Sequence, residues 1–399
     1  MRRLSGPLAV VLTAVPVRVW LASSTDLSPD EAYYLASARF GTVPDHPPLL
    51  VWMLSACDRM KWLGLELRTR LPAIVVSAAV ALGIALLVHE LEGRLAAPRR
   101  NPNFSALLAA ILATWLPIPL AGGFVATPDA PAMLAVVAAL HWASTDAPSP
   151  LRSALMACLV ALGALSKVVV VPIAIVAAVI APRRHRERLL WLLPLALTSP
   201  WITASLRLQS RHAFGAVGGW SAAGVITAAA ATLVAALLLW CPPVVLAGVK
   251  RLRKLPAVYA AVFALVAALL LGSTLARALP PEPNWWTPAA IPVIVAGSMA
   301  IGALDARSRF ACIALAVVPT AVALTHVVRP WLPIPRSIDP TARLHGWRAG
   351  APPLDAPGVG RYAAAAELCI YRSECDDIRR YIDNLRSDIS GDEPRWSKR

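Results

Sequence analysis

The chain has 399 residues, of which 57% are hydrophobic and only 15% are charged, and its mean hydropathy is +0.61. Soluble domains usually contain about 25% charged residues, so this composition excludes an ordinary soluble protein and indicates one that crosses a membrane several times. The net charge of +15 does not indicate nucleic-acid binding, because the basic residues lie in short loops between apolar segments, as the positive-inside rule describes.

The first apolar segment, residues 8–22, follows two arginines and resembles a signal peptide. It contains Pro16 and Arg18 and lacks a small-residue cleavage site, so we expect a retained helix. The sequence predicts ten further apolar segments, at 72–89, 104–120, 130–144, 151–165, 168–181, 189–206, 222–247, 256–272, 286–303 and 310–328. The predicted fold is therefore an all-α polytopic membrane protein with about eleven transmembrane helices.

The stretch 151–181 decides the topology, because Ser166 and Lys167 interrupt an otherwise continuous apolar run. One long helix would bury Lys167 in the middle of the membrane and would move later basic loops to the outer side. Two short helices leave the short outer loops with only four cations, Lys167, Arg207, Arg211 and Arg277, and concentrate the other loop cations inside. We therefore expect two helices, a cytoplasmic N-terminus, and an outer side that carries the first loop (23–71) and the C-terminal tail.

The first outer loop contains the most unusual polar stretch, Ser28-Pro29-Asp30-Glu31-Ala32-Tyr33-Tyr34. Ser28 and Glu31 have the spacing of a helix capping box, with Pro29 at the first helical position. Capping explains Glu31 well and Asp30 only in part. The residues alone leave open whether Asp30 and Glu31 are a helix cap or a catalytic acid/base pair.

Polar residues in the rest of the first outer loop and in four other predicted outer segments have both a structural and a functional interpretation. His46 lies in a rigid proline-rich turn, followed by an amphipathic helix at the membrane surface. Asp129 begins an apolar helix after Thr127-Pro128, which also fits a helix cap. Lys167, Arg211 and, in the first apolar segment, Arg18 are suited to neutralise a phosphate or to snorkel to lipid headgroups. Asn284 and Trp285 precede a helix where an aromatic belt is also expected.

The last segment, 329–399, changes to mixed charge, and we expect an amphipathic helix over 367–385 and a small outer tail separate from the membrane region 1–328. Cys369 and Cys375 would lie in an oxidising compartment and are able to pair there. Six residues apart on one helix is poor geometry for a disulfide. No cysteine spacing fits a metal site; the carboxylates and His46 leave a divalent metal possible, although no ligand spacing demands one.

The order Asp-Glu-Ala-Tyr-Tyr, Asp-His-Pro-Pro-Leu, Thr-Pro-Asp-Ala-Pro, Ser-Lys and Pro-Asn-Trp resembles the bacterial GT-C glycosyltransferases, the group of the protein O-mannosyltransferases and aminoarabinose (lipid A sugar) transferases. The resemblance runs from Arg18 to about Trp347. It implies a GT-C helical bundle in a bacterial inner membrane, a polyprenyl-phosphate-linked sugar donor used on the periplasmic side, and a lipid, glycan or protein acceptor, with inversion at the anomeric carbon.

By the same resemblance, Asp30, with Glu31 beside it, matches the family's catalytic acidic position. Arg18, His46, Asp129 and Lys167 match other motif positions; we predict that they bind substrate together with Tyr33, Tyr34, Arg211, Asn284 and Trp285. A transporter or lipid flippase is the alternative from another class, although it would be expected to show repeats and mid-membrane polar residues. A catalytically inactive relative of the family is the second alternative.

Overall fold

The computed structural model describes residues 5–42, 46–95, 102–145, 149–182, 185–214, 221–279, 282–355, 359 and 361–382. Across these residues the regular elements are helices, which confirms the predicted all-α class. In chain order they are α1 (Ser5–Ser24), α2 (Pro29–Arg39), α3 (Leu49–Asp58), α4 (Leu65–Leu95), α5 (Pro102–Trp115), α6 (Pro117–Ala121), α7 (Asp129–Ser144), α8 (Pro150–Ala164), α9 (Val170–Ile180), α10 (His185–Leu197), α11 (Ser199–Phe214), α12 (Ala222–Trp240), α13 (Pro242–Leu252), α14 (Ala257–Arg277), η2 (Pro283–Trp286), α15 (Thr287–Gly302), α16 (Ala306–Val328), η3 (Ala342–Leu344) and α17 (Arg361–Arg372).

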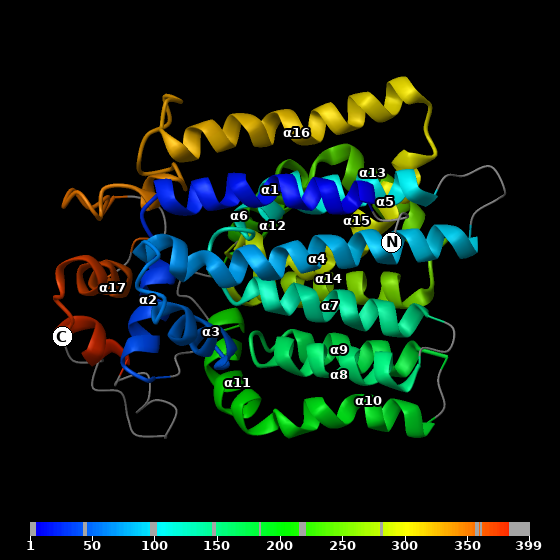
Figure 1. Cartoon of the computed structure of the whole chain (residues 1–399), viewed down its shortest axis with the longest axis horizontal. Helices are drawn as coiled ribbons and strands as arrows, with labels where there is room; N and C mark the ends of the chain where they lie inside the picture. The colour runs from blue at the N-terminus through cyan, green and yellow to red at the C-terminus, as the bar shows by residue number, and fades with distance from the viewer. Residues whose placement is uncertain are drawn as a thin grey trace.

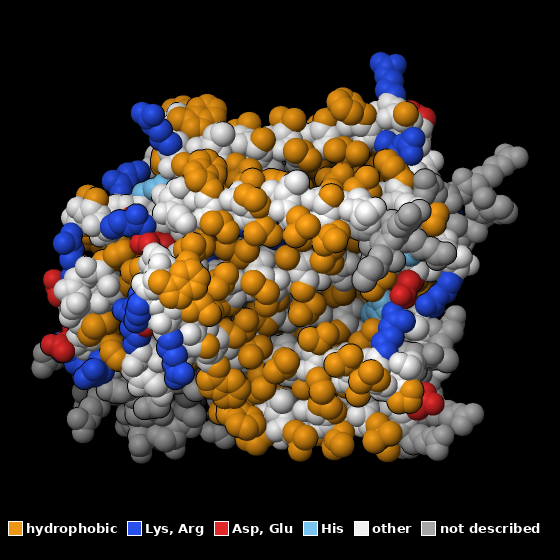
Figure 2. Space-filling view, in the orientation of Figure 1, with side chains coloured by type: hydrophobic (Ala, Val, Ile, Leu, Met, Phe, Trp, Pro, Cys, Tyr) orange, Lys and Arg blue, Asp and Glu red, His pale blue; other side chains and the backbone are white. Residues whose placement is uncertain are grey.

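The long helices lie side by side and run in the same general direction, and the short helices α2, α3 and α17 gather at one end of this bundle (Figure 1). Apolar side chains form a broad band across the middle of the molecule, with lysines and arginines toward both ends (Figure 2). Such a band is what a multi-pass protein presents to lipid hydrocarbon. The end that carries α2, α3 and α17 is the end that the sequence analysis assigns to the outer side.

Every predicted apolar segment corresponds to a helix or to a pair of helices. Among the described residues, five helices are long and apolar enough to cross a membrane alone, and the number rises to seven when two bent pairs are each taken as one span. Others, such as α5, α8 and α9, are apolar but shorter. The polytopic architecture is confirmed, while the expectation of about eleven transmembrane helices exceeds the five to seven that helix length and composition support among the described residues.

The predicted interruption near Ser166 is present. Helix α8 ends at Ala164, α9 begins at Val170, and Lys167 lies in the turn between them. The hydroxyl of Ser166 donates to the carbonyl oxygen of Pro128 over 2.7 Å. The turn is therefore tied to the start of α7, and Lys167 does not lie within a continuous helix.

Three segments predicted as single helices are instead broken. Segment 104–120 is divided at Leu116 into α5 and α6. Segment 189–206 is divided at Thr198 into α10 and α11, which meet at 62°. Segment 222–247 is divided at Cys241 into α12 and α13, which meet at 98°. Pro242 and Pro243 follow that break and cannot donate the backbone hydrogen bonds that would continue α12. Cys241 adopts a positive φ of 65°, which redirects the chain.

Helices α13 and α15 approach closely because glycines face backbone on both sides. A Cβ atom on Gly248 would lie 2.5 Å from the carbonyl oxygen of Val293, and one on Gly297 would lie 2.8 Å from that of Val244. Small residues at the interface let the backbones of membrane helices approach closely. This contact fixes α15, whose N-terminal end follows the Asn284-Trp285 motif.

The described part of the tail packs on the first outer loop. One apolar cluster joins Leu35 and Ala36 of α2 to Ala366, Ile370 and Ile378 of the tail. The predicted boundary at residue 328 stays a prediction, but on the structure the tail shares its apolar core with α2.

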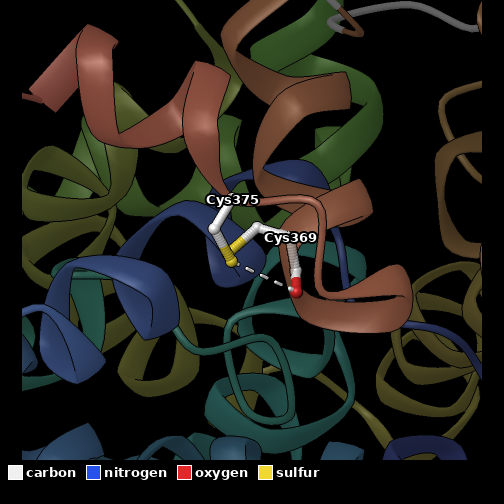
Figure 3. The surroundings of a disulfide bond; sticks show 2 residues. All are labelled: Cys369 and Cys375. Atoms are coloured by element: carbon white, nitrogen blue, oxygen red, sulfur yellow. Dashed lines mark hydrogen bonds between the residues drawn. A yellow bond between two sulfur atoms is a disulfide. The ribbon is translucent and has the colours of Figure 1, made fainter.

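The helix expected over 367–385 is wrong in extent, because α17 ends at Arg372 and a separate helical stretch covers 376–382. Ser373, with a positive φ of 63°, reverses the chain between them. This reversal brings the Cα atoms of Cys369 and Cys375 to 4.3 Å, and the two residues form a disulfide (Figure 3). The expectation of poor geometry assumed one continuous helix, and it fails for that reason.

Candidate functional site

Helix α2 starts with the predicted capping box. The backbone N–H of Ser28 donates to Oε2 of Glu31 over 2.8 Å, and the N–H of Glu31 donates to the Ser28 hydroxyl over 3.4 Å. Pro29 occupies the first helical position, where its missing N–H leaves no donor to satisfy. Asp30 and Glu31 therefore have fixed positions in the first turn, one residue apart and pointing in different directions.

Glu31 is fully buried and forms a salt bridge with Arg70 of α4, which is also fully buried. Arg70 donates from Nε to Oε1 over 2.9 Å and from Nη2 to Oε2 over 2.8 Å, a two-point contact that suits the planar guanidinium. The backbone N–H of Ala126 donates to Oε1 as well, over 2.8 Å. Burial alone would raise the pKa of Glu31, but the charge and hydrogen bonds of Arg70 outweigh burial and hold that pKa below its usual value.

Arg70 is the main residue that the sequence analysis missed. Its remaining donors bind the carbonyl oxygens of Ala22 and Asp26, and both the carbonyl and the hydroxyl of Thr25, over 2.6–3.1 Å. One guanidinium thus joins the end of α1, the start of α2 and the start of α4. The only signal in the sequence was an arginine just before the apolar part of a helix, which is also where a loop cation is expected.

Asp30 differs from its neighbour. It is partly exposed, and its Oδ1 accepts a hydrogen bond of 3.4 Å from the hydroxyl of Tyr362 in α17. The prediction that Glu31 is catalytic is not tested directly, but its four hydrogen bonds and complete burial match a residue that fixes α2. Asp30, on the same turn, retains access to solvent.

A second group of predicted residues is brought into direct contact. Asp129, at the start of α7, accepts from Nζ of Lys167 over 2.6 Å and from the side-chain amide of Asn284 over 3.0 Å. Lys167 and Asn284 are 38 and 155 positions from Asp129 in the chain. The arrangement places a carboxylate, an ammonium and an amide together, which is a set of groups able to bind a phosphate or sugar hydroxyls.

His46 and Tyr34 connect the two groups. Their ring centroids are 6.0 Å apart, and His46 also interacts electrostatically with Asp129. Tyr34 lies four residues after Asp30 on α2, so the two side chains share one face of that helix. Backbone contact completes the link, because the N–H of Leu49 donates to the carbonyl of Leu165 over 2.8 Å, next to the Ser166-Lys167 turn.

The other predicted substrate-binding residues have different positions. Tyr33 packs edge-on against Tyr362 and Tyr381 of the tail. The ring of Trp285 has the guanidinium carbon of Arg277 6.0 Å from its centroid. Arg211 lies in α11, but its side chain is outside the described residues.

Arg18 is completely buried in α1. It donates to the Ser77 hydroxyl over 2.9 Å and to the carbonyl of Thr114 over 3.4 Å, whereas its Nε has no hydrogen-bond partner. A Cβ atom on Gly123 would lie 2.4 Å from that Nε, so the Gly122-Gly123 pair provides the space that Arg18 fills. Arg18 supports the loop that leads to Ala126 and Asp129.

No group of three or more His, Cys, Asp or Glu side chains that would hold a metal ion occurs among the residues that the structure describes. A divalent metal therefore stays an open expectation from the sequence.

Glu367 in α17 is a second residue near the candidate site, after Arg70, that the sequence analysis did not single out. It is fully buried, and neither carboxyl oxygen has a hydrogen-bond partner. Burial, followed by the negative charges of Glu31 and Asp26, raises the pKa of Glu367 to about 10. Glu367 is therefore neutral while α17 is docked at neutral pH.

We expect the substitution Arg70→Met to lower the free energy of unfolding by about 3–5 kcal/mol, because it leaves the Glu31 carboxylate buried without a counter-ion. The double variant Arg70→Met/Glu31→Gln should recover part of this loss. Arg39→Met, which breaks a partly exposed ion pair with Asp58, should cost less than about 1 kcal/mol. Unfolding in detergent micelles measures all three; equal losses for Arg70→Met and Arg39→Met would contradict this account.

We expect the docking of α17 to weaken as pH rises. The docked state keeps the proton of Glu367 up to a pH of about 10, whereas the released helix loses it near the ordinary value of 4.5. The stabilisation is thus complete below about pH 4.5 and is lost progressively toward pH 10. Hydrogen-exchange protection of residues 361–372 should fall between pH 5 and pH 9 in the wild type and stay level in Glu367→Gln.

The exposed Glu374, in the same tail, provides the control for that experiment. Glu374→Gln should keep the wild-type dependence on pH. A Glu367→Gln variant with the same slope as the wild type would show that docking does not depend on this proton.

Comparison with known proteins gives the fold. No family model matches the sequence, and no curated protein matches it either. The crystal structure of ArnT from Cupriavidus metallidurans in the apo state is similar, with a TM-score of 0.56, 14% sequence identity, and coverage of 96% of this chain and 75% of that chain. The structure of the same protein bound to undecaprenyl phosphate gives a TM-score of 0.57, 16% identity and the same coverage.

At these identities the likeness establishes the architecture, and it extends over nearly the whole chain. The GT-C-type helical bundle expected from the sequence motifs is therefore confirmed as a fold. The chain is a polytopic helical membrane protein with the fold of ArnT.

Proposed function

We propose that the chain is an integral-membrane glycosyltransferase that moves a sugar from a polyprenyl-phosphate donor to a hydroxyl of a lipid, glycan or protein acceptor. The observation that carries this proposal is the separation of the two adjacent carboxylates. Glu31 is buried in a complete set of hydrogen bonds, while Asp30 is partly exposed at the same end of the molecule as the Asp129-Lys167-Asn284 group. The ArnT-like fold supports it, since one of the similar structures holds undecaprenyl phosphate.

In the proposed reaction, Asp30 accepts the proton of the acceptor hydroxyl. The acceptor oxygen forms a bond to the anomeric carbon, and the bond between that carbon and the phosphate oxygen breaks with its electron pair on the phosphate. Attack from the face opposite the leaving group inverts the anomeric configuration. A positioned carboxylate base contributes about 10²–10⁴-fold to such a transfer.

The phosphate of the leaving lipid would be held by Lys167, which Asp129 keeps in place. Asn284 in turn donates to Asp129. Since phosphate carries more negative charge after the bond breaks, a fixed ammonium stabilises the product side of the step more than the ground state. Tyr34 and Trp285 supply aromatic faces suited to a sugar ring, and Arg18 and Arg211 are further candidate phosphate ligands.

The proposal also includes an orientation. The end of the bundle with α2, α3 and α17 would face the periplasm, with the N-terminus in the cytoplasm, so that the protein lies in a bacterial inner membrane. The excess of arginine and lysine in the loops at the opposite end supports this orientation.

We expect Asp30→Asn to reduce sugar transfer by at least about 100-fold, because the amide cannot accept the acceptor proton. Purified protein in lipid vesicles would be incubated with radiolabelled polyprenyl-phosphate sugars, and labelled acceptor would be counted. Asp58→Asn is the matched control, since Asp58 lies on the same loop but is occupied by Arg39, Lys61 and Arg68. Sugar transfer by Asp30→Asn at the wild-type rate would show that Asp30 and Glu31 act only as a helix cap.

We expect the double variant Lys167→Met/Asp129→Asn to bind undecaprenyl phosphate about 10- to 100-fold more weakly, which corresponds to the loss of one charge-assisted contact. Removing both partners avoids an unpaired carboxylate that would confuse the result. Lys61→Met removes an exposed cation of the first outer loop and should leave affinity unchanged. Titration of vesicles with the lipid, followed by native mass spectrometry, measures each affinity; wild-type affinity in the double variant would exclude Lys167 from the phosphate site.

A further inference from the structure

Tyr362 of the C-terminal tail contacts the first turn of α2. The hydroxyl of Tyr362 donates to Oδ1 of Asp30 over 3.4 Å, although the two residues are 332 positions apart in the chain. The Tyr362 ring also packs edge-on against Tyr33, with centroids 5.7 Å apart. Thus Asp30, the candidate base, contacts a side chain that belongs to none of the sequence motifs.

A disulfide closes the segment that holds Tyr362 in place. Cys369 in α17 is bonded to Cys375 beyond the chain reversal at Ser373 (Figure 3). The residues that follow, 376–382, return along α17, and Tyr381 stacks on Tyr362 with centroids 5.4 Å apart and rings inclined by 17°. Tyr33, Tyr362 and Tyr381 therefore form one aromatic cluster beside Asp30.

Polar contacts fix the tail to the same loop from a second direction. The hydroxyl of Tyr371 donates to Oε1 of Glu66 over 2.9 Å and accepts from the N–H of Leu27 over 3.0 Å. Arg348 contacts the carboxylates of Glu66 and Asp26 at 2.7 and 3.4 Å. Because both Tyr371 and Tyr362 lie on α17, these contacts define where the Tyr362 hydroxyl is placed relative to α2.

We propose that Tyr362 is a positioning residue for Asp30, and that the disulfide-closed tail exists to hold its hydroxyl against that carboxylate. The inference rests on the proposed glycosyl transfer and deepens it, since it assigns a role to the tail. A hydrogen bond from a hydroxyl favours the ionised form of a carboxylate. It therefore keeps the base ready to accept a proton at lower pH, and it restricts the rotation of the Asp30 side chain.

The variant Tyr362→Phe tests this directly, because it retains both ring contacts and removes only the hydroxyl. Losing one hydrogen bond worth about 0.5–1.5 kcal/mol should move the acid limb of the kcat/KM profile upward by about 0.5–1 pH unit. Tyr381→Phe is the matched control: it removes a hydroxyl from the same cluster and should leave the acid limb in place. The full-length protein in lipid vesicles is used throughout.

A measurement independent of turnover accompanies the profile. A water-soluble carbodiimide reacts with carboxyl groups in their protonated form, so peptide mass spectrometry of Asp30 labelling against pH gives a midpoint for that residue. We expect this midpoint to rise in Tyr362→Phe by the same amount as the acid limb. The double variant Cys369→Ser/Cys375→Ser should shift both in the same direction, since it releases Tyr381 from its stacked position.

An unchanged acid limb and an unchanged labelling midpoint in Tyr362→Phe would overturn the inference, and so would equal shifts in Tyr362→Phe and Tyr381→Phe. Wild-type protein that transfers no sugar from any polyprenyl-phosphate donor would instead overturn the proposed function. If the protein transfers no sugar but the labelling midpoint of Asp30 still rises in Tyr362→Phe, the hydrogen bond between Tyr362 and Asp30 exists without a role in sugar transfer. The positioning role is then excluded for that separate reason.

Discussion

The salt bridge between Glu31 and Arg70 is the interaction on which the outer end of the molecule depends. Both side chains are fully buried, so each would be strongly destabilising alone. Arg70 directs all of its N–H groups to acceptors in residues 22–31, and Glu31 also receives the N–H of Ala126. This pair thus holds α1, α2, α4 and the loop before α7 in one arrangement, and that arrangement determines where Asp30 and Asp129 lie.

The position of Arg70 also explains how two adjacent carboxylates acquire different environments. On a helix, neighbouring residues point about 100° apart, so the contact that buries Glu31 turns Asp30 toward the tail and toward solvent. On the same face of α2, Tyr34 approaches His46 and, beyond it, the contact of Asp129 with Lys167 and Asn284. Polar motifs that are separate in the sequence thereby lie together at one end of the bundle.

Much of this arrangement is predictable from the sequence, and what is not predictable has physical reasons. The break at Ser166-Lys167 follows from the cost of a charge in the membrane, and the capping box follows from local spacing. The break at Cys241 depends on a backbone conformation that the two following prolines permit but do not require. Arg70 finds its partner 39 residues away, and no local pattern separates it from a loop cation that faces lipid headgroups.

The contacts between the tail and α2 also cannot be predicted from local sequence, because their partners lie far apart in the chain. The neutral state of Glu367 has an electrostatic explanation. Arg70 has no donor left after Glu31 and the backbone carbonyls are bound, so it offers no further hydrogen bond when α17 docks. A further negative charge there would have no counter-ion, which is why Glu367 must dock as a neutral acid. Glu31 remains charged because it is paired, and Glu367 is neutral because it is buried without a hydrogen-bond partner and near other carboxylates. Asp30, whose charge also acts on Glu367, keeps part of its surface in solvent, which is the environment in which a carboxylate can exchange a proton.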